Sequence, residues 1–195
     1  MKIFLSLLIL IFSFQSLTKA DDISEFEIEG MSIGDSLLNY MTADEIKYNT
    51  LKYFNDERKY YVVGKTYDLK SYEQVEIYLK TNDKKYIIRT LGGFIQLEGK
   101  ECLSKKKEID KELKKILSNL KIYPGTRSHD WDKTGKSKQI QTNYVFGVDA
   151  SKENHIRTEC VVWSEDIKKK DGFVDNLLVI AMTEEIIQWI GSGYQ

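Results

Sequence analysis

The chain has 195 residues, of which 42% are hydrophobic and 30% are charged, a balance typical of a folded globular protein rather than a disordered one. Its 29 basic and 30 acidic side chains give a formal net charge of −1, so the chain lacks the basic excess that is usual in nucleic-acid-binding proteins. The length fits one domain, or two small half-domains that share a core.

The first twenty residues predict a cleaved signal peptide. Lys2 supplies a positive charge, residues 3–14 form a largely apolar run, and small residues precede Asp21. A spanning helix needs about 20 apolar residues, so this run is too short to be a stable anchor. We expect cleavage between Ala20 and Asp21, which leaves a periplasmic or secreted domain of residues 21–195 without a transmembrane span. An uncleaved anchor is the alternative.

The start of this domain predicts a short strand and two short helices. Residues 21–29 alternate apolar and acidic side chains, as a short edge strand does. Asp35 or Ser32 is placed to cap a short helix over residues 35–41. Thr42 and Glu45 form a capping-box sequence, which predicts a second helix that runs to about Phe54.

The next part of the chain predicts antiparallel strands, because it is rich in β-branched and aromatic residues and alternates apolar with polar side chains. The expected strands cover residues 60–63, 72–80 and 86–91. Asn82-Asp83 lies between the last two and predicts a hairpin turn. Gly92-Gly93 predicts a break or bulge before the third strand continues over residues 94–97.

Residues 103–120 have the clearest helical periodicity in the chain. Their apolar side chains form one stripe, which consists of Ile109, Leu113, Ile116, Leu117 and Leu120. The stripe predicts a helix that packs on one face of the sheet. Pro124-Gly125 ends this segment, and the polar residues 125–138 predict a surface loop. A boundary between two halves of the domain is expected near residues 121–138.

The second half again predicts strands, over residues 139–146, 156–163 and 177–182, followed by a short closing helix that Thr183 caps and that extends through Trp189. The predicted fold class is therefore α+β, with a mostly antiparallel sheet of about six strands. The similar strings IIRT at residues 87–90 and HIRT at residues 155–158 leave open whether the halves are a duplication.

Cys102 and Cys160 are the two cysteines of the chain, and an oxidising compartment favours their pairing. The bridge would close a loop of nearly sixty residues, which the chain-entropy model values at about 4 kcal/mol before any strain. Two separate buried thiols are the alternative. Neither cysteine lies in a Cys-x-x-Cys sequence or beside a histidine, so redox catalysis is not expected.

The sequence Gly34-Asp35-Ser36-Leu37 resembles the nucleophile block of the GDSL family of lipases and esterases. A serine nucleophile needs a histidine base that an acid orients, and that family supplies both as Asp-x-x-His near the C-terminus. The two histidines of this chain, His129 and His155, follow Thr126 and Lys152 at that spacing. The block therefore lacks its partners, and a helix cap is the simpler role for Asp35.

The segment His129-Asp130-Trp131-Asp132 places three possible metal ligands within four residues. A catalytic zinc site needs three ligands of suitable geometry, usually with at least two histidines, and His155 belongs to a separate predicted strand. We expect a solvated loop with one anchoring Trp, with a loose divalent-ion site as the alternative. The sequence assigns no catalytic residue, metal site or cofactor.

Residues 105–121 hold seven lysines and three acidic side chains, which gives this helix a local charge of +4. A basic amphipathic helix can lie on an anionic membrane surface. The same apolar stripe is what the domain needs to cover one face of its sheet, and this burial is the favoured interpretation.

Residues 26–36 (FEIEGMSIGDS), residues 85–95 (KYIIRTLGGFI), Cys102 with its lysine-rich helix, and Trp189-Ile190 resemble segments of a group of small exported proteins of marine planktonic bacteria. That group has no established activity, so the resemblance implies export and a rough fold. The Gly30-Met31 start, followed by short helices and antiparallel strands, also resembles small envelope modules of the outer-membrane assembly lipoprotein type, although this chain lacks the cysteine that carries their lipid.

The expected function is that of a non-enzymatic exported domain that binds another envelope protein or a small ligand. Trp131, Tyr72 and Tyr78 are the aromatic residues expected to be exposed for such contacts. The alternatives are a serine hydrolase that uses Ser36 and a peripheral membrane protein that uses the lysines of residues 105–121.

Overall fold

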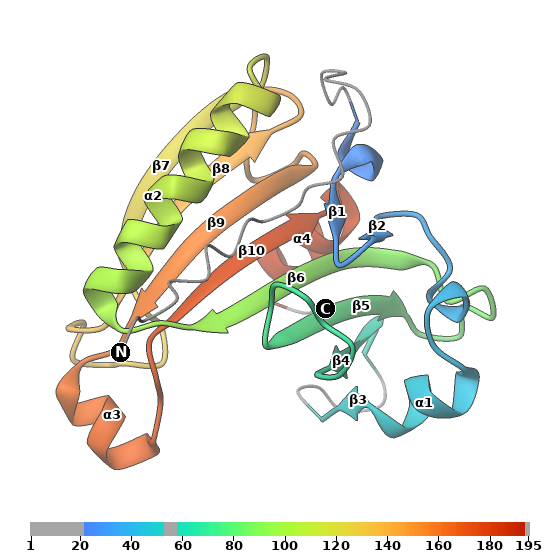
Figure 1. Cartoon of the computed structure of the whole chain (residues 1–195), viewed down its shortest axis with the longest axis horizontal. Coiled ribbons are helices and arrows are strands. Elements are labelled where there is room, and N and C mark those ends of the chain that lie inside the picture. The colour runs from blue at the N-terminus through green and yellow to red at the C-terminus, as the bar shows by residue number, and fades with distance from the viewer. Residues whose placement is uncertain (1–21, 53–57, 194–195) are drawn as a thin grey trace, which may run out of the picture.

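The computed structural model describes residues 22–52 and 58–193 (Figure 1). The predicted signal peptide and its cleavage site between Ala20 and Asp21 lie outside these residues. In the described part of the chain, no helix is long and apolar enough to cross a membrane. The fold class is α+β, as predicted.

Eight strands form one antiparallel sheet, in the order β3-β4-β5-β6-β10-β9-β8-β7, so the sheet is larger than the six strands predicted. Its members are β3 (Thr50–Leu51), β4 (Tyr60–Lys65), β5 (Gln74–Lys80), β6 (Ile88–Gln96), β7 (Lys121–Ser128), β8 (Lys138–Val145), β9 (His155–Val162) and β10 (Asn176–Met182). A separate small sheet pairs β1 (Glu27–Ile28) with β2 (Met31–Ser32), where an edge strand was predicted. The helical elements are η1 (Ile23–Glu25), η2 (Leu37–Asn39), α1 (Ala43–Tyr48), α2 (Gly99–Ile116), α3 (Glu165–Asp171) and α4 (Glu184–Gly191).

Two parts of the sheet share one topology, a helix followed by four antiparallel strands. The first part is α1 with β3 to β6, and the second is α2 with β7 to β10 and with α3 inserted before the last strand. The last strands of the two parts, β6 and β10, pair at the centre of the sheet. The similar strings at residues 87–90 and 155–158 lie at β6 and β9, which do not correspond, so these strings do not mark the topological repeat.

The region predicted as a loop, residues 125–138, contains the end of β7, which pairs along its whole length with β8. Pro124 fits inside β7 because β7 is the last strand of the sheet, where a residue without an N–H can face the open edge. The connecting loop is therefore limited to residues 129–137.

Gly92 and Gly93 lie inside β6 without the predicted break. A Cβ atom on Gly93 would lie 2.5 Å from Cδ1 of Tyr72, so the close approach of this ring explains the glycine. The irregularity in register falls instead between Tyr78 and Leu79 of β5. The predicted turn at Asn82-Asp83 is confirmed, with Asn82 in the left-handed region at a φ of 64°.

The capping box at Thr42 and Glu45 is confirmed, since each side chain accepts a hydrogen bond from the backbone N–H of the other. α1 nevertheless ends at Tyr48, because the chain then pairs with β4 as β3. The predicted helix end at Phe54 lies outside the described residues. Residues 35–41 contain only the short turn η2, whose N-cap is Ser36 and not the predicted Asp35 or Ser32.

α2 covers one face of the sheet, as predicted, but it begins at Gly99 rather than at residue 103. Leu113 and Leu117 are each 1% exposed at the end of α2, where they join the core formed by the strands. α4 packs on the opposite face, where Ile186 and Trp189 contact Tyr60 of β4. Figure 1 shows α2 in front of the sheet and α4 behind it.

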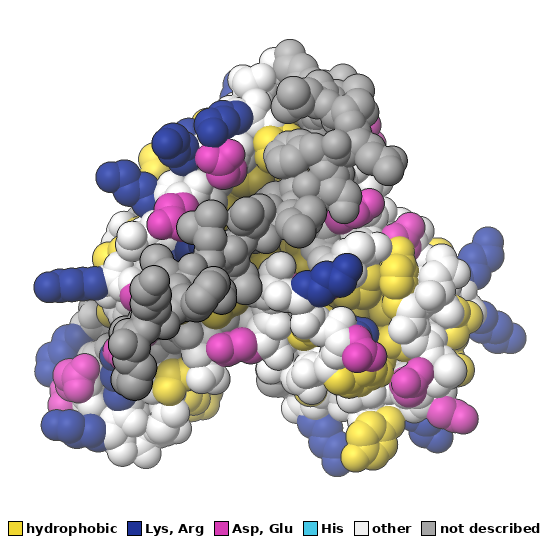
Figure 2. Space-filling view, in the orientation of Figure 1, with side chains coloured by type: hydrophobic (Ala, Val, Ile, Leu, Met, Phe, Trp, Pro, Cys, Tyr) yellow, Lys and Arg dark blue, Asp and Glu magenta, His cyan; other side chains and the backbone are white. Residues whose placement is uncertain are grey.

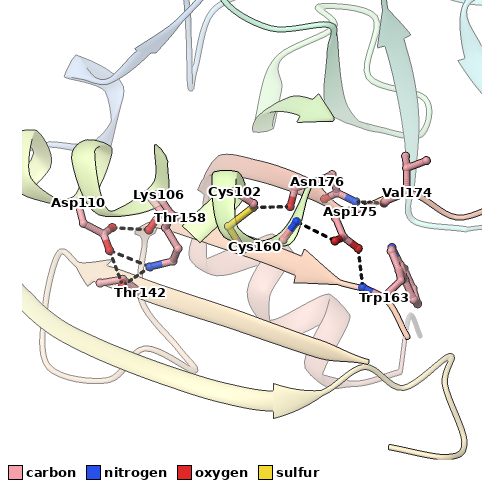
Figure 3. The surroundings of a disulfide bond; sticks show 11 residues. Cys102, Lys106, Asp110, Thr142, Thr158, Cys160, Trp163, Val174, Asp175 and Asn176 are labelled. Atoms are coloured by element: carbon pink, nitrogen blue, oxygen red, sulfur yellow. Dashed lines mark hydrogen bonds and ion pairs between the residues drawn. A yellow bond between two sulfur atoms is a disulfide. The ribbon is translucent and has the colours of Figure 1, made fainter. Parts of the chain in front are cut away.

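The predicted disulfide is confirmed (Figure 3). Cys102 of α2 and Cys160 of β9 are joined at an S–S distance of 2.02 Å, with their Cα atoms 6.0 Å apart. The bond fastens the first turns of α2 to the sheet across a sequence separation of 58 residues.

Candidate functional site

The face of the sheet opposite α2 carries a group of polar side chains on β7, β8 and β9. Because side chains alternate along a strand, the odd-numbered residues of these three strands share this face. The register places them in cross-strand rows of Arg127 with Gln139, Gly125 with Gln141 and Glu159, and Tyr123 with Asn143 and Arg157. We call this group the polar face, and its members are Tyr123, Arg127, Gln139, Gln141, Asn143, Arg157 and Glu159.

Hydrogen bonds connect the buried members of the polar face. Gln139 Nε2 donates to Glu159 Oε1 at 2.7 Å, and Arg157 Nε donates to Asn143 Oδ1 at 2.7 Å. Arg157 Nη1 also lies 3.8 Å from Glu159 Oε2. These bonds hold the side chains in place beneath the more exposed members, Tyr123, Arg127 and Gln141.

Burial lowers the pKa of the basic groups on this side of the sheet. It lowers the pKa of Arg157, an effect that Glu159 opposes. Burial, with a smaller contribution from the charge of Arg157, lowers the pKa of His155 to about 4, so His155 is neutral at pH 7. Burial also lowers the pKa of His129, again against the attraction of Glu159.

Four aromatic rings continue the polar face toward α3, and we call them the aromatic cluster: His129, Trp131, Trp163 and Phe173. The ring centroids of His129 and Trp163 are 4.2 Å apart, and those of Trp163 and Phe173 are 4.6 Å apart. Trp131 lies 5.8 Å from Phe173 and is 61% exposed. His129 follows Arg127 by two residues, so the aromatic cluster directly adjoins the polar face.

Asp132 fixes the loop that carries Trp131. Its Oδ2 accepts hydrogen bonds from the N–H and hydroxyl of Ser137, at 2.8 and 2.6 Å, and from the hydroxyl of Ser164, at 3.1 Å. Its Oδ1 accepts from the N–H and hydroxyl of Thr134, at 2.9 and 2.6 Å. These donors hold the pKa of Asp132 well below its usual range. Because Ser164 precedes α3, the bonds also fasten the loop to that helix.

Asp175 fixes the other side of the aromatic cluster (Figure 3). Its Oδ1 accepts a hydrogen bond from Trp163 N at 2.8 Å, and its Oδ2 accepts from Lys168 Nζ and Gly99 N, each at 2.9 Å. The end of β9, the helix α3 and the start of α2 therefore meet at one carboxylate that is 2% exposed. The aromatic rings are thus presented by two anchored segments.

No protein-family model, curated protein or solved structure matches the chain. Of the residues that form this surface, the sequence suggested only Trp131 as an exposed contact. A signal for the polar face was present, since polar Gln139, Gln141 and Asn143 occupy every second position of one predicted strand. Which of the two faces they share became clear only from the packing of α2.

Tyr72 and Tyr78 do not form the exposed surface that the sequence suggested. Both are partly buried: Tyr72 packs over Gly93, and Tyr78 packs beside Tyr60 and α4. Burial raises the pKa of Tyr72 well above its usual range.

Ser36, the candidate nucleophile of the GDSL-like string, donates a hydrogen bond from its Oγ to the backbone carbonyl of Lys85 at 2.7 Å. Asp35 accepts hydrogen bonds from Ser32 N and Tyr40 OH. Both side chains therefore link the N-terminal segment to itself and to the hairpin of β5 and β6. Among the described residues, neither histidine is a hydrogen-bond partner of Ser36.

The side chains of His129 and Asp132 do not converge as metal ligands. His129 Nδ1 accepts a hydrogen bond from Trp131 N at 3.2 Å, and both oxygens of Asp132 are engaged by the loop. Over residues 22–52 and 58–193, no three His, Cys, Asp or Glu side chains are grouped so that they could hold a metal ion.

The lysine-rich helix α2 buries one of its lysines. Lys106 Nζ donates to Asp110 Oδ2 at 2.8 Å and to Thr142 Oγ1 at 2.7 Å, and Asp110 Oδ1 accepts from Thr158 Oγ1 at 2.5 Å and from Tyr144 OH at 2.9 Å (Figure 3). Burial would raise the pKa of Asp110, but the bonds from Lys106 and Thr158 outweigh it and lower the pKa. This group anchors α2 to the sheet.

Most of the remaining lysines of α2 are exposed, and Figure 2 shows basic side chains along the outer side of this helix. A groove of about 480 Å³ runs beside them, lined by Leu103, Ile140, Asp110 and five lysines of α2. The apolar stripe itself is used for packing on the sheet.

Proposed function

We propose that this chain is an exported, non-enzymatic binding protein, and that the polar face and the aromatic cluster together form its binding surface. The observation that carries the proposal is Trp131, a large aromatic side chain that is 61% exposed although its loop is fixed by five hydrogen bonds to Asp132. Exposed Trp and Arg side chains on a rigid support are typical of binding hot spots. A support that is already ordered reduces the entropy cost of binding.

Two features support export. The N-terminal twenty residues have the order of regions found in signal peptides. The disulfide between Cys102 and Cys160 is of a kind that persists in oxidising compartments. Expression of the full chain in a bacterial host, followed by mass spectrometry of the periplasmic product, should give a protein that begins at Asp21 and lacks two thiol hydrogens.

The binding surface is tested by amide chemical shifts of the domain of residues 21–195 on titration with a mixed set of sugars, dipeptides, nucleotides and short fatty acids. The expected result is that shifts cluster on β7, β8 and the 129–137 loop. Trp131→Ala should remove them, whereas Leu38→Ala, which truncates a side chain that is 44% exposed in the N-terminal segment, should not. Shifts that cluster elsewhere, and survive Trp131→Ala, would contradict the proposal.

The hydrolase alternative depends on Ser36, whose hydroxyl is committed to a backbone carbonyl. Assays with p-nitrophenyl esters compare the domain with its Ser36→Ala variant. We expect no turnover that depends on Ser36; turnover that this substitution abolishes without unfolding the domain would favour the enzyme.

A further inference from the structure

The exposed ring of Trp131 offers a flat apolar face beside hydrogen-bonding groups, and the partly buried ring of Phe173 is tilted by 57° against it. A pyranose ring has a matching pair of properties, because its C–H bonds form an apolar face while its hydroxyls lie around the rim. Aromatic side chains combine well with such ligands, since they bury area while nearby polar groups fix orientation. The aromatic cluster meets the first of these requirements at the end of the polar face.

The polar face meets the second requirement through Gln141. Its Oε1 is buried and has no hydrogen-bond partner among the described residues, so its hydrogen-bonding capacity is unused. The neighbouring position on β7 is Gly125, which places no side chain over it. A terminal amide offers both donors and an acceptor, which suits vicinal hydroxyl groups. Behind it, Gln139 and Glu159 are already bonded to each other and keep the row rigid.

The charge of the site favours an anion. Residues 121–138, which include β7 and the loop, hold five basic and two acidic side chains, and one of the basic side chains, Lys136, is paired with Asp166. Arg127 is exposed and has no ion-pair partner in the part of the chain that the structure describes. A guanidinium group of this kind binds a carboxylate through two parallel hydrogen bonds.

We propose that the binding surface takes an acidic oligosaccharide, in which a sugar ring packs on Trp131, the carboxylate of a uronic acid unit pairs with Arg127, and hydroxyl groups bond to Gln141. This inference rests on the proposed binding function and names its ligand class.

The test is calorimetric titration of the disulfide-bonded domain with hexamers of galacturonate and of mannuronate, and with the methyl esters of the same hexamers. The esters keep the rings and hydroxyls but remove the charge. We expect at least one acid hexamer to bind at least ten-fold more tightly than its ester, and the difference to shrink as NaCl is raised from 50 to 300 mM. Equal binding of acid and ester would overturn the acidic preference.

Variants test the separate roles of Arg127 and Trp131 in binding. Arg127→Gln should bring acid and ester to equal affinity, and Trp131→Ala should weaken both by ten-fold or more. Lys111→Gln, which removes one positive charge from the outer surface of α2, is the matched control and should change neither. Circular dichroism confirms that each variant is folded.

The result also separates this inference from the proposed function. If neither acid hexamer binds with a Kd below 1 mM while other probes still shift amides of the polar face, the carbohydrate inference is wrong and the binding surface stands. If binding occurs but is insensitive to Trp131→Ala and Arg127→Gln, the sugar is bound elsewhere and the inference is also wrong.

Discussion

The two faces of the sheet formed by β7 to β10 differ in how their polar groups are bonded. On the α2 face, the charges of Lys106 and Asp110 are buried under a helix and bonded to each other and to hydroxyl groups. On the polar face, Arg127 is exposed without an ion pair among the described residues, and Gln141 keeps an acceptor without a partner. The strands β8 and β9 supply the hydroxyl groups of the first set on even residues and most side chains of the polar face on odd residues.

This difference separates polar groups that hold the fold from polar groups that are free for a ligand. A buried charge must be paired, because an unpaired one costs several kcal/mol. The exposed guanidinium of Arg127 costs little, since water satisfies it until a ligand arrives, whereas the buried Oε1 of Gln141 lacks a hydrogen bond until a ligand supplies one. We therefore expect changes on the α2 face to reduce stability, and changes on the polar face to reduce binding.

The largest effect should come from Asp110→Ala. The substitution leaves Lys106, with a side chain that is 6% exposed, as a buried charge without its counter-ion, and removes the acceptor of Thr158 and Tyr144. We expect a loss of about 3–5 kcal/mol in the free energy of unfolding, measured with urea. The double variant Lys106→Met with Asp110→Leu should recover the part of this loss that comes from the unpaired charge. A cost below about 1 kcal/mol for Asp110→Ala would break the distinction between the faces.

Removal of the disulfide is a second test of how much the α2 face contributes to stability. Replacement of both Cys102 and Cys160 by Ala removes the constraint on a loop with a sequence separation of 58 residues, and we expect a loss of up to about 4 kcal/mol. Wild type in a reducing agent is the matched control, because it keeps the side chains and removes only the bond. Ligand binding by the folded fraction should persist, since the bond lies on the face opposite the polar face.

His155 is an exception to this difference between the faces. It lies on the same side of the sheet as the polar face and is nevertheless fully buried, so we expect it to affect stability. Burial lowers its pKa to about 4 from 6.5, so the unfolded chain takes up a proton at higher pH than the folded chain does. Stability is therefore complete above pH 6.5 and falls as the pH drops toward 4, by as much as about 3 kcal/mol.

Unfolding by urea at pH 7.5, 5.5 and 4.5 measures this loss. Asp110 and Asp132, two of the carboxylates with lowered pKa, lose their contribution only below about pH 4, outside this window. His155→Gln should flatten most of the pH dependence. His129→Gln should flatten less of it, because His129 is only partly buried. An unchanged profile in His155→Gln would mean that the buried histidine is not the cause.

The sequence predicted what depends on local pattern. The capping box, the apolar stripe of α2 and most strands follow from the spacing of side chains along the chain. The cysteine pair followed from its number and the expected compartment. β7 was missed because the rule that proline and glycine end strands does not hold at an edge, and edge position is a property of the whole sheet.

The candidate site was harder to predict because its parts come from distant segments. Trp131, Trp163 and Phe173 are separated in sequence and meet only through Asp132 and Asp175, two acids that read as ordinary loop residues. The alternation of polar residues along the strand predicted that they share one face of the sheet. It did not predict whether α2 covers that face. Local patterns carry no information about which of two surfaces a distant helix will cover.

The smallest effect on stability should come from Trp131→Ala, and that small effect is the sharpest test of the comparison. The side chain is 61% exposed, and its loop is held by Asp132 rather than by the ring. Truncation should therefore change the free energy of unfolding by no more than about 0.5 kcal/mol. Asp132→Ala is the contrasting variant, because it keeps the ring and removes the five hydrogen bonds that position it. If Trp131→Ala destabilised the domain as much as Asp132→Ala does, the ring would stabilise the fold. The main argument that Trp131 is exposed for ligand binding would then be wrong.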